Sequence, residues 1–199
     1  VNKGIFYLNY LGELFPLQIF GKHNMQNIAA AHCVCEYLGI DTKSFCQAMM
    51  SYKSAEKRLE KYFENDKLLI YRDFAHAPSK VVSTTNAMKN QFPDKEIIAC
   101  LELHTYSSLN PKFLTEYEGA LEKANHKIVY YNPEALKIKR MEPITAEDIK
   151  TSFADDEIEV VTNSDELKLH LEKMDRKNKV FLMMSSANFG GIDLNELFT

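Results

Sequence analysis

Apolar positions recur with two different periods along the chain, and the first part reads as a short hairpin. Residues 4–10 and 14–20 are rich in aromatic and β-branched side chains, with a glycine-containing turn between them. This pattern predicts two strands joined by a turn. A lone hairpin is only marginally stable in water, so we expect it to pack on further structure.

Two helices are expected after the hairpin. Apolar residues fall at helical spacing from 24 to 38, and Gly39 is placed to end that helix. Asp41 or Thr42 can cap a second helix that continues to about residue 50.

From about residue 55 the pattern alternates between strands and helices. Apolar and β-branched runs predict five strands, at 67–72, 96–102, 127–131, 157–161 and 179–184. Helical spacing predicts four helices, at 79–91, 111–124, 145–153 and 164–175. Thr145 and Ser164 are the candidate caps of the last two, while 137–140 is a polar stretch that matches neither pattern.

Strand and helix in repeated alternation, with short connections, predict an α/β fold. The expected architecture is a Rossmann-like, mostly parallel sheet with helices on both faces, preceded by the hairpin and two helices. We place the boundary near 52–56, which gives a first unit of residues 1–53 and a second of 54–199.

Composition narrows the class of protein. A chain of 199 residues with 45% hydrophobic residues suits one domain with an appendage, or two small ones. A net charge of -4 gives no general attraction for nucleic acid or an anionic membrane. No run approaches the roughly 20 apolar residues of a membrane span, and residues 1–4 show no signal-peptide pattern. We expect a soluble protein that binds no nucleic acid and inserts into no membrane.

The four cysteines, Cys33, Cys35, Cys46 and Cys100, lack the spacing of a zinc site. We expect them to be buried free thiols, as in a reducing cytoplasm.

Residues with useful chemistry follow four of the five predicted strands. The segments are 73–78, 102–108, 132–133 and 185–191. Ligands of open α/β sheets bind beyond the carboxyl ends of the strands, so this placement predicts a site at that edge.

Three of the candidate residues each admit two interpretations. Asn24 precedes a helix and could cap it, or it could offer its amide to a ligand together with Asn27. Arg58 lies in the mixed-charge run 56–61, which is typical of a solvated surface, although a guanidinium also suits a phosphate or a base. Asp73 could cap a turn or accept hydrogen bonds from hydroxyl groups.

Two further candidates lie in loops. His76 is either a packed loop histidine or a cation near reacting groups. The serines at 185 and 186, with the turn at Gly190-Gly191, either form a tight turn or hold a carboxylate.

Three sequence blocks carry a family resemblance. The chain contains, in this order, Gly-Lys-His-Asn-Met-Gln-Asn at 21–27, Arg-Leu-Glu at 58–60 and Asp-Phe-Ala-His-Ala-Pro at 73–78. The ordered set resembles the ATP-facing half of the Mur ligases, which join amino acids or peptides to the UDP-muramoyl cell-wall precursor. The first unit would then be the C-terminal end of the central ATPase domain, and the second the C-terminal domain.

The resemblance implies roles for individual residues. Asn24, with Asn27, would lie near the adenine of ATP, Arg58 against the nucleotide, and Asp73 on the ribose. His76 would be the catalytic residue, near the reacting phosphate and the incoming amine. The family often has a second His where this chain has Ala77, so one polar contact is missing.

One part of the family pattern is absent. Mur ligases need a phosphate loop of the type G-x-x-G-K-[ST], but the single Gly-Lys pair here is followed by His23. We therefore expect the chain to be part of a longer enzyme and inactive alone. ATP would bind with Mg²⁺, whose ligands belong to the missing part of the central domain, and we assign no metal ligand in this chain.

Two loops resemble substrate-binding segments of the family. The segment 102–108 is similar to Pro-His-x-Tyr-Ser-Arg, but Ser108 replaces the Arg, so His104 and neighbouring serines would have to serve. The segment 183–191 resembles the Met-Ser-x-x-x-Phe-Gly-Gly ending of muropeptide ligases, which attach a recycled tripeptide. The predicted substrate-binding residues are His104, Ser185, Ser186, Asn188 and Phe189.

The function that this resemblance implies is ATP-dependent ligation in peptidoglycan recycling. The substrates would be UDP-N-acetylmuramate and the tripeptide L-alanyl-γ-D-glutamyl-meso-diaminopimelate. Two alternatives stay open: ligation of free L-alanine to the same nucleotide sugar, and a nucleotide- or peptide-binding α/β module without catalysis. An upstream phosphate loop would favour either ligase over the binding module.

Overall fold

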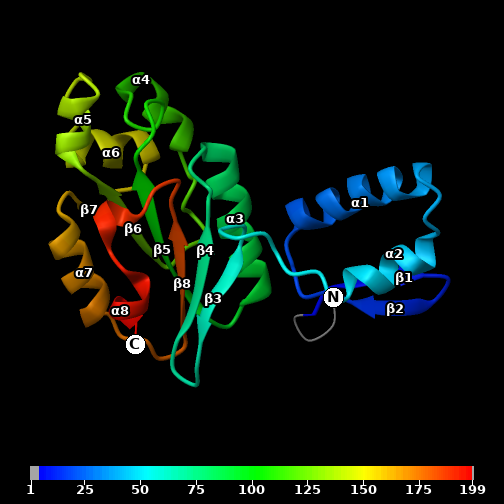
Figure 1. Ribbon diagram of the computed structural model, residues 1–199. Coiled ribbons are helices and arrows are strands. Elements are labelled where there is room, and N and C mark those ends of the chain that lie inside the picture. The colour runs from blue at the N-terminus through cyan, green and yellow to red at the C-terminus, as the bar shows by residue number, and fades with distance from the viewer. Residues whose placement is uncertain (1–4, 199) are drawn as a thin grey trace.

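The computed structural model describes residues 5–198 and begins with the predicted hairpin (Figure 1). Strands β1 (Tyr7–Tyr10) and β2 (Glu13–Pro16) pair antiparallel, with Tyr7 opposite Pro16. Both are shorter than the predicted runs 4–10 and 14–20, and residue 4 lies outside the described residues. Proline has no N–H to extend a ladder, which agrees with the end of β2 at Pro16.

Two helices follow the hairpin, α1 (Lys22–Tyr37) and α2 (Thr42–Met49). Helix α1 begins two residues earlier than predicted, because Gly21 takes the cap position with a φ of 93°. Asn24 therefore lies inside the first turn, and the interpretation of Asn24 as a cap is wrong. The Asp41 cap of α2 is confirmed, since its carboxylate accepts a 3.0 Å hydrogen bond from the Ser44 N–H.

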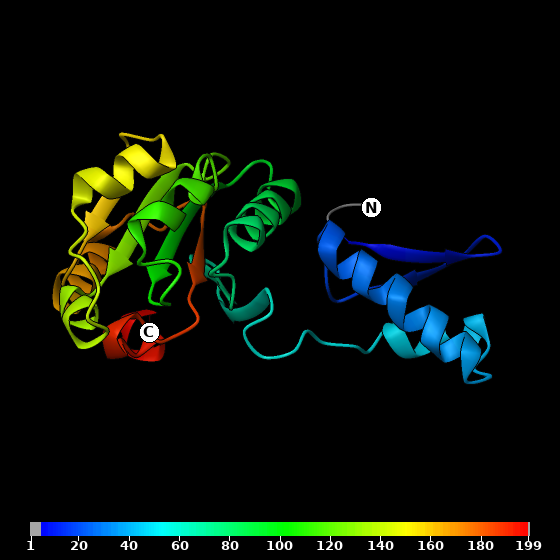
Figure 2. The ribbon, with the colours of Figure 1, turned by 90° about the horizontal axis from the view of Figure 1, so that it is seen from above.

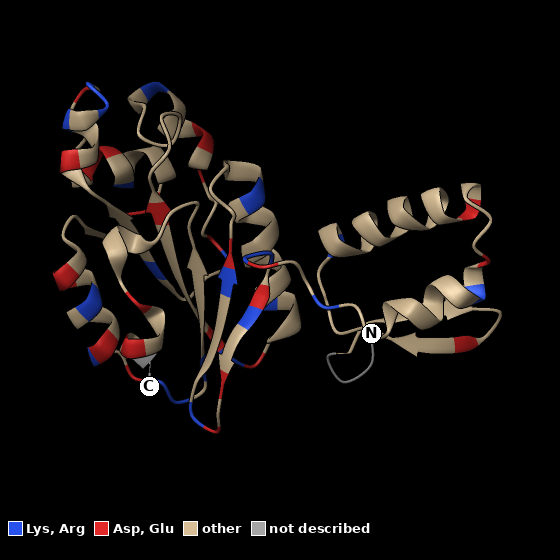
Figure 3. Cartoon of the chain, viewed as in Figure 1, with Lys and Arg blue, Asp and Glu red and all other residues tan. Residues whose placement is uncertain are grey.

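The hairpin and the two helices share a small apolar core of their own. Its buried members are Phe15, Leu17, Ile19, Ile28, Phe45 and Cys46. Much of α1 is exposed, including the Tyr37 side chain at 90%, and Figure 3 shows few charges along it. Residues 50–59 form neither helix nor strand. The division of the chain at 53/54 stays a prediction.

The second unit is built on a six-stranded sheet. The strands are β3 (Glu60–Glu64), β4 (Leu69–Asp73), β5 (Glu96–Leu103), β6 (His126–Tyr131), β7 (Glu159–Val161) and β8 (Lys179–Met184). Their order is β3-β4-β8-β5-β6-β7, and all neighbours are parallel except the antiparallel pair of β3 and β4. The predicted Rossmann-like, mostly parallel α/β fold is confirmed. Strand β3 was missed because its sequence continues the charged run 56–61.

Helices cover both faces of the sheet, as Figure 2 shows from above. One face packs on α3 (Pro78–Gln91), α4 (Pro111–Leu114), the 3₁₀ turn Thr115–Tyr117, α5 (Pro133–Ile138) and α6 (Ala146–Phe153). The other face packs on α7 (Ser164–Lys173), the 3₁₀ turn Phe189–Gly191 and α8 (Leu194–Phe198). Alternate residues of β4 enter the two cores, since Tyr71 belongs to the first and Ile70 to the second.

The predicted helix 111–124 is confirmed only in its first part, since α4 covers Pro111–Leu114 and no α-helix continues to 124. Helical structure ends at Tyr117, whose ring stacks on Phe153 at 5.1 Å, and Gly119 has a φ of 66°. The polar stretch 137–140 begins within α5, which the sequence did not predict, and α8 was missed as well.

The cysteines only partly meet the expectation. Cys46 and Cys100 are buried free thiols, and burial raises the pKa of both above the ordinary value. Cys33 is exposed and Cys35 half-buried, so the prediction that all four are buried is wrong.

Of the two caps predicted for the last two helices, Thr145 and Ser164, only Thr145 is confirmed. Its hydroxyl accepts the Asp148 N–H at 3.1 Å, while the Asp148 carboxylate accepts the Thr145 N–H at 2.7 Å, which is a complete capping box. At α7 the cap is Asn163, whose side-chain oxygen accepts two backbone N–H groups, so the assignment to Ser164 is wrong.

Removing the Thr145 cap is expected to destabilise the protein. Thr145→Ala leaves the Asp148 N–H without its side-chain acceptor, at a cost of about 0.5–2 kcal/mol in unfolding free energy. Urea unfolding measures this cost. The matched control is Thr151→Ala, an exposed position inside the same helix, where a change within about 0.5 kcal/mol is expected. Equal losses in both variants would contradict a capping role.

Candidate functional site

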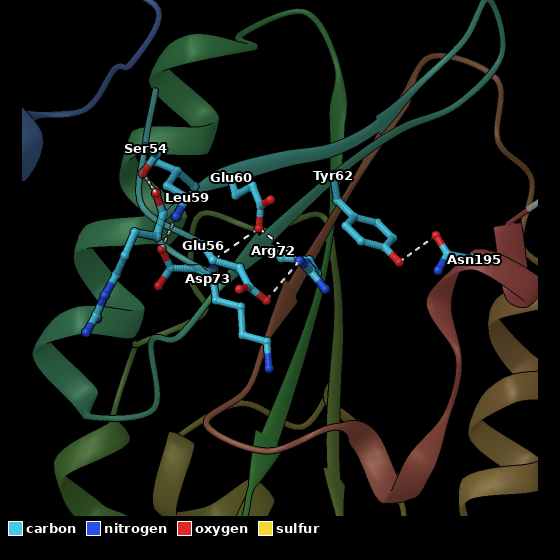
Figure 4. A network of polar contacts seen from close by, with 10 residues as sticks. Ser54, Glu56, Leu59, Glu60, Tyr62, Arg72, Asp73 and Asn195 are labelled. Carbon is cyan, nitrogen blue, oxygen red and sulfur yellow. Dashed lines mark hydrogen bonds and ion pairs between the residues drawn. The ribbon is translucent and has the colours of Figure 1, made fainter. Parts of the chain in front are cut away.

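Asp73 lies at the carboxyl end of β4, with its side chain only 7% exposed. Its two carboxylate oxygens accept 2.6 Å hydrogen bonds from the backbone N–H groups of Leu59 and Ala75. Figure 4 shows the contact with Leu59. Burial raises the pKa of this carboxyl, whereas those hydrogen bonds and the charges of His23 and Arg58 act to lower it. A carboxylate has about four acceptor sites, so two remain for a ligand.

Arg58 follows the irregular segment that leads into β3, and its guanidinium is exposed. The guanidinium carbon lies 5.1 Å from the centre of the Phe74 ring, which in turn meets His76 edge-on at 5.2 Å. The backbone at Arg58 is held by a hydrogen bond from the Ser54 hydroxyl. Arg58, Phe74 and His76 therefore form a continuous row beside Asp73.

His76 is half-buried in the loop between β4 and α3. Its Nδ1 lies 2.9 Å from the Phe74 carbonyl oxygen. Because a carbonyl only accepts, Nδ1 carries the proton, and Nε2 forms no hydrogen bond within residues 5–198. The hydroxyl of Tyr117 donates to the backbone carbonyl of His76 and anchors the loop.

The start of α1 lies close to this edge of the sheet. His23 is half-buried, and burial lowers its pKa; the charge of Asp73 raises it and that of Lys80 lowers it further. A cleft of about 280 Å³ lies between α1 and α3. Its polar lining residues are Lys22, His23, Gln26, Ser83, Asn86 and Asn90.

The two predicted adenine contacts differ in their surroundings. Asn24 is half-buried, and its amide donates to the Phe20 carbonyl at 2.8 Å, so its side chain is held in place. Asn27 is exposed, one turn further along α1. Neither lines the cleft between α1 and α3.

The loop after β5 contains a half-buried His104. Ser108, which stands where the family has an Arg, is only 1% exposed. Its hydroxyl accepts the Thr105 N–H at 2.9 Å and closes a tight turn. Ser108 is therefore a structural residue of the loop.

The loop after β8 carries the other predicted substrate residues, and two of these side chains are already engaged within the protein. The hydroxyl of Ser185, which is 5% exposed, donates to Glu102 and accepts the Ala187 N–H at 2.7 Å. The Phe189 ring is 4% exposed and packs in the core beneath α7 and α8. Substrate contacts of these two residues stay predictions, and the structure gives both an internal role.

Ser186 and Asn188 of the same loop are not engaged within the protein in this way. The Ser186 hydroxyl oxygen is buried but has no hydrogen-bond partner within residues 5–198. Asn188 is exposed at the same loop. These two side chains are therefore the better placed of the four to meet a ligand.

A backbone contact joins the two predicted parts of the site. The Ser185 N–H donates to the Asp73 carbonyl at 3.0 Å, because β4 and β8 are parallel neighbours that end together. The loop of 73–78 and the loop of 185–191 are therefore adjacent at the carboxyl edge of the sheet.

A second polar cluster lies on the other side of β4 (Figure 4). The Arg72 guanidinium lies 4.0 Å from the centre of the Tyr62 ring and forms a 3.0 Å ion pair with Glu60. The Tyr62 hydroxyl donates to Asn195 at 2.7 Å. A cavity of about 260 Å³ lies among these residues and extends to Asp73.

Sequence reasoning missed two residues of this region. Glu102 is a carboxylate at 3% exposure inside an apolar strand, and its position after the run 96–101 was the available signal. His23 belonged to a recognised block but was given no role, and the structure places it within electrostatic reach of Asp73.

Among residues 5–198, no three His, Cys, Asp or Glu side chains gather closely enough to hold a metal ion. No helix in the described part of the chain is long and apolar enough to cross a bilayer.

Comparison with known proteins identifies the relatives of this chain, although no family model matches it. The UDP-N-acetylmuramate–L-alanine ligase of Gloeobacter violaceus is 30% identical over 185 residues, which cover 92% of this chain and 39% of the relative. Among solved structures, the UDP-N-acetylmuramate-alanine ligase of Thermotoga maritima matches with a TM-score of 0.68 at 18% identity, over 89% of this chain and 37% of that one. The murein peptide ligase of Psychrobacter arcticus matches with a TM-score of 0.64 at 20% identity, over 93% and 38%.

The chain is a relative of the Mur ligases. It corresponds to their C-terminal part, and it spans 16–39% of the length of the first curated relatives that it matches. The likeness to the Mur ligase structures extends over the hairpin and its helices as well as the sheet, since it covers about nine-tenths of the chain.

Proposed function

We propose that this chain is the C-terminal portion of an ATP-dependent ligase that joins UDP-N-acetylmuramate to L-alanyl-γ-D-glutamyl-meso-diaminopimelate. The observation that carries the proposal is the contact between Asp73 and Ser185, which brings the loop proposed for the nucleotide beside the loop proposed for the peptide. An amide-forming ligase needs its activated acid and its amine close together, so adjacent sites fit that chemistry.

In this proposal, four residues contact ATP. Asp73 offers its two remaining acceptor sites to the ribose hydroxyls, and Arg58 lies beside it against the nucleotide. Asn24 and Asn27 approach the adenine from the first turns of α1. This set fits a nucleoside, since it offers amides, a carboxylate and one guanidinium. The Mg²⁺ ligands and the phosphate loop belong to other parts of the full-length protein.

ATP, when bound, supplies the phosphoryl group that activates the UDP-sugar carboxylate. His76 then lies where the incoming amine arrives, with Nδ1 fixed by the Phe74 carbonyl and Nε2 free to meet a proton or an oxygen of the reacting groups. The peptide is held by His104, Ser186 and Asn188, and by Ser185 and Phe189 through the shape of their loop.

Ligation of free L-alanine is the second candidate, because several relatives carry that activity in their names. Proteins named UDP-N-acetylmuramate–L-alanine ligase match this chain at 28–31% identity. The ending Phe189-Gly190-Gly191, on the other hand, supports the tripeptide. A non-catalytic binding module is a third possibility, which the activity of the full-length protein would exclude.

A competition assay separates these candidates. The full-length protein is given ATP, Mg²⁺, UDP-N-acetylmuramate and equal concentrations of tripeptide and L-alanine, and the products are resolved by mass spectrometry. We expect the tripeptide adduct to dominate. Preference for L-alanine would reject the muropeptide proposal and keep the ligase, whereas no product with either amine would reject both.

The Ser186 hydroxyl is expected to contribute to peptide binding. In the full-length enzyme, Ser186→Ala removes a buried hydroxyl that has no internal partner, and the turn glycines are untouched. A neutral hydrogen bond is worth about 0.5–1.5 kcal/mol, so KM for tripeptide is expected to rise roughly 2- to 13-fold with little change for ATP. Steady-state kinetics with each substrate varied in turn give both constants. The control is Ser51→Ala, an exposed serine after α2, and an equal change there would contradict a specific role for Ser186.

A further inference from the structure

We infer that Glu102 is a positioning residue that holds the loop 185–191 in the shape in which it presents Ser186 and Asn188 to the peptide. The inference rests on the proposed function for the identity of the ligand, but the ordering of the loop can be tested without it. No part of the resemblance or of the sequence pattern assigned a role to this residue.

Both hydrogen bonds that the Glu102 carboxylate accepts within residues 5–198 come from that loop. Its carboxylate is 3% exposed at the end of β5, and one oxygen accepts both the Ser185 hydroxyl and the Phe189 N–H, the latter at 2.7 Å. The Ser185 hydroxyl in turn accepts the Ala187 N–H at 2.7 Å. The carboxylate therefore holds the Phe189 backbone directly, and it holds the Ala187 backbone indirectly through the Ser185 hydroxyl.

Among the residues that the structure describes, no ion pair offsets the burial of this carboxylate. Within residues 5–198, no Lys, Arg or His nitrogen forms an ion pair with Glu102. A buried carboxylate is costly unless it accepts good hydrogen bonds, and the ones it accepts come from the loop. Disorder of the loop would remove the hydrogen bonds that offset the burial of the Glu102 carboxylate, so its burial favours an ordered loop.

The far end of the loop is fixed by packing. Gly190 has a φ of 71°, and a Cβ added there would lie 2.5 Å from the Tyr130 hydroxyl and 3.0 Å from the Ser164 Cβ. The loop is thus held by Glu102 at 185 and 189 and against β6 and α7 at 190. Between these fixed points lie Ser186, whose hydroxyl has no internal partner, and the exposed Asn188. A loop held in this way meets a ligand without a large loss of conformational entropy.

The first test is Glu102→Met in the full-length enzyme. Methionine has a similar size but accepts neither hydrogen bond. KM for the tripeptide is expected to rise roughly 10- to 100-fold, because two hydrogen bonds that are each worth about 2- to 13-fold are lost. KM for ATP is expected to stay within about twofold, since Asp73 and Arg58 do not contact Glu102. The matched control is Cys100→Ala, a fully buried position of the same strand, which should lower thermal stability and leave both constants unchanged.

Two further variants test the mechanism. Glu102→Gln keeps one side-chain oxygen as an acceptor, so it is expected to restore most of the tripeptide KM and to remain folded if the methionine variant does not. Ser185→Ala removes the same link from the other side, so its effect and that of Glu102→Met are expected to be far less than additive when combined.

Hydrogen exchange tests the ordering of the loop independently of any substrate. The amides of Ala187 and Phe189 are expected to exchange at least about tenfold faster in Glu102→Met, whereas β5 and β8 amides keep their protection. If the wild-type protein ligates neither amine, the proposed function fails and this measurement alone decides on Glu102. Unchanged exchange at both amides, or a tripeptide KM that moves no more than in Cys100→Ala, would overturn the inference.

Discussion

Purified residues 1–199 are expected to show neither ATP hydrolysis nor amide formation with UDP-N-acetylmuramate and tripeptide. Charge that develops on a transferring phosphoryl group is stabilised by several preorganised donors and a metal ion. This sequence contains no G-x-x-G-K-[ST] segment, and no metal-binding group of side chains occurs within residues 5–198. Arg58 alone cannot replace them, so we expect turnover at least roughly 10³-fold below that of the full-length protein.

A coupled phosphate-release assay, with the full-length protein as the positive control, measures this difference. Circular dichroism must show that the isolated chain is folded, because an unfolded fragment would be inactive whether or not it lacked the phosphate-binding machinery. Robust ligation by residues 1–199 would refute the view that the phosphate-binding machinery lies elsewhere in the protein.

The alternation of strands and helices was predictable because its signal is local. Runs such as 96–102 and 179–184 are apolar and β-branched, and parallel strands buried on both faces have this composition. The helix expected at 111–124 ends early because Gly119 adopts a left-handed conformation and Tyr117 stacks on Phe153 instead of continuing a helix. That contact joins residues far apart in sequence, and no local pattern contains it.

The location of the candidate site at the carboxyl edge of the sheet was also predictable from the sequence. The strand assignment placed Asp73 and Ser185 at the same edge of the sheet, whereas their adjacency follows from the pairing of β4 with β8, which the sequence did not predict. The partners of individual side chains did not follow. The pairing of Ser185 with Glu102 spans 83 residues, and it gives the Ser185 hydroxyl a partner within the protein. Ser108 is another such residue, because its hydroxyl closes a turn with Thr105.

In the full-length enzyme, Asp73→Asn is expected to weaken ATP binding much more than peptide binding. The carboxylate already accepts the Leu59 and Ala75 N–H groups, and two acceptor sites remain for the ribose hydroxyls. Asparagine replaces one oxygen by a donor, so at least one charge-assisted hydrogen bond is lost. Such a bond is worth about 1.5–3 kcal/mol, which predicts a rise of roughly 10- to 150-fold in the dissociation constant for ATP. Isothermal titration with a non-hydrolysable ATP analogue gives this constant directly.

The control for Asp73→Asn is Arg72→Met at the preceding position of β4. Its side chain lies on the opposite face of the sheet, where it pairs with Glu60 and stacks on Tyr62. This variant disturbs the same strand without removing an acceptor from the proposed ribose site, so the ATP constant is expected to stay within about threefold. A large loss in Arg72→Met would mean that the strand, and not the Asp73 carboxylate, governs ATP affinity. An unchanged ATP constant in Asp73→Asn, together with a large rise in the tripeptide constant, would place the peptide and not the ribose at the end of β4.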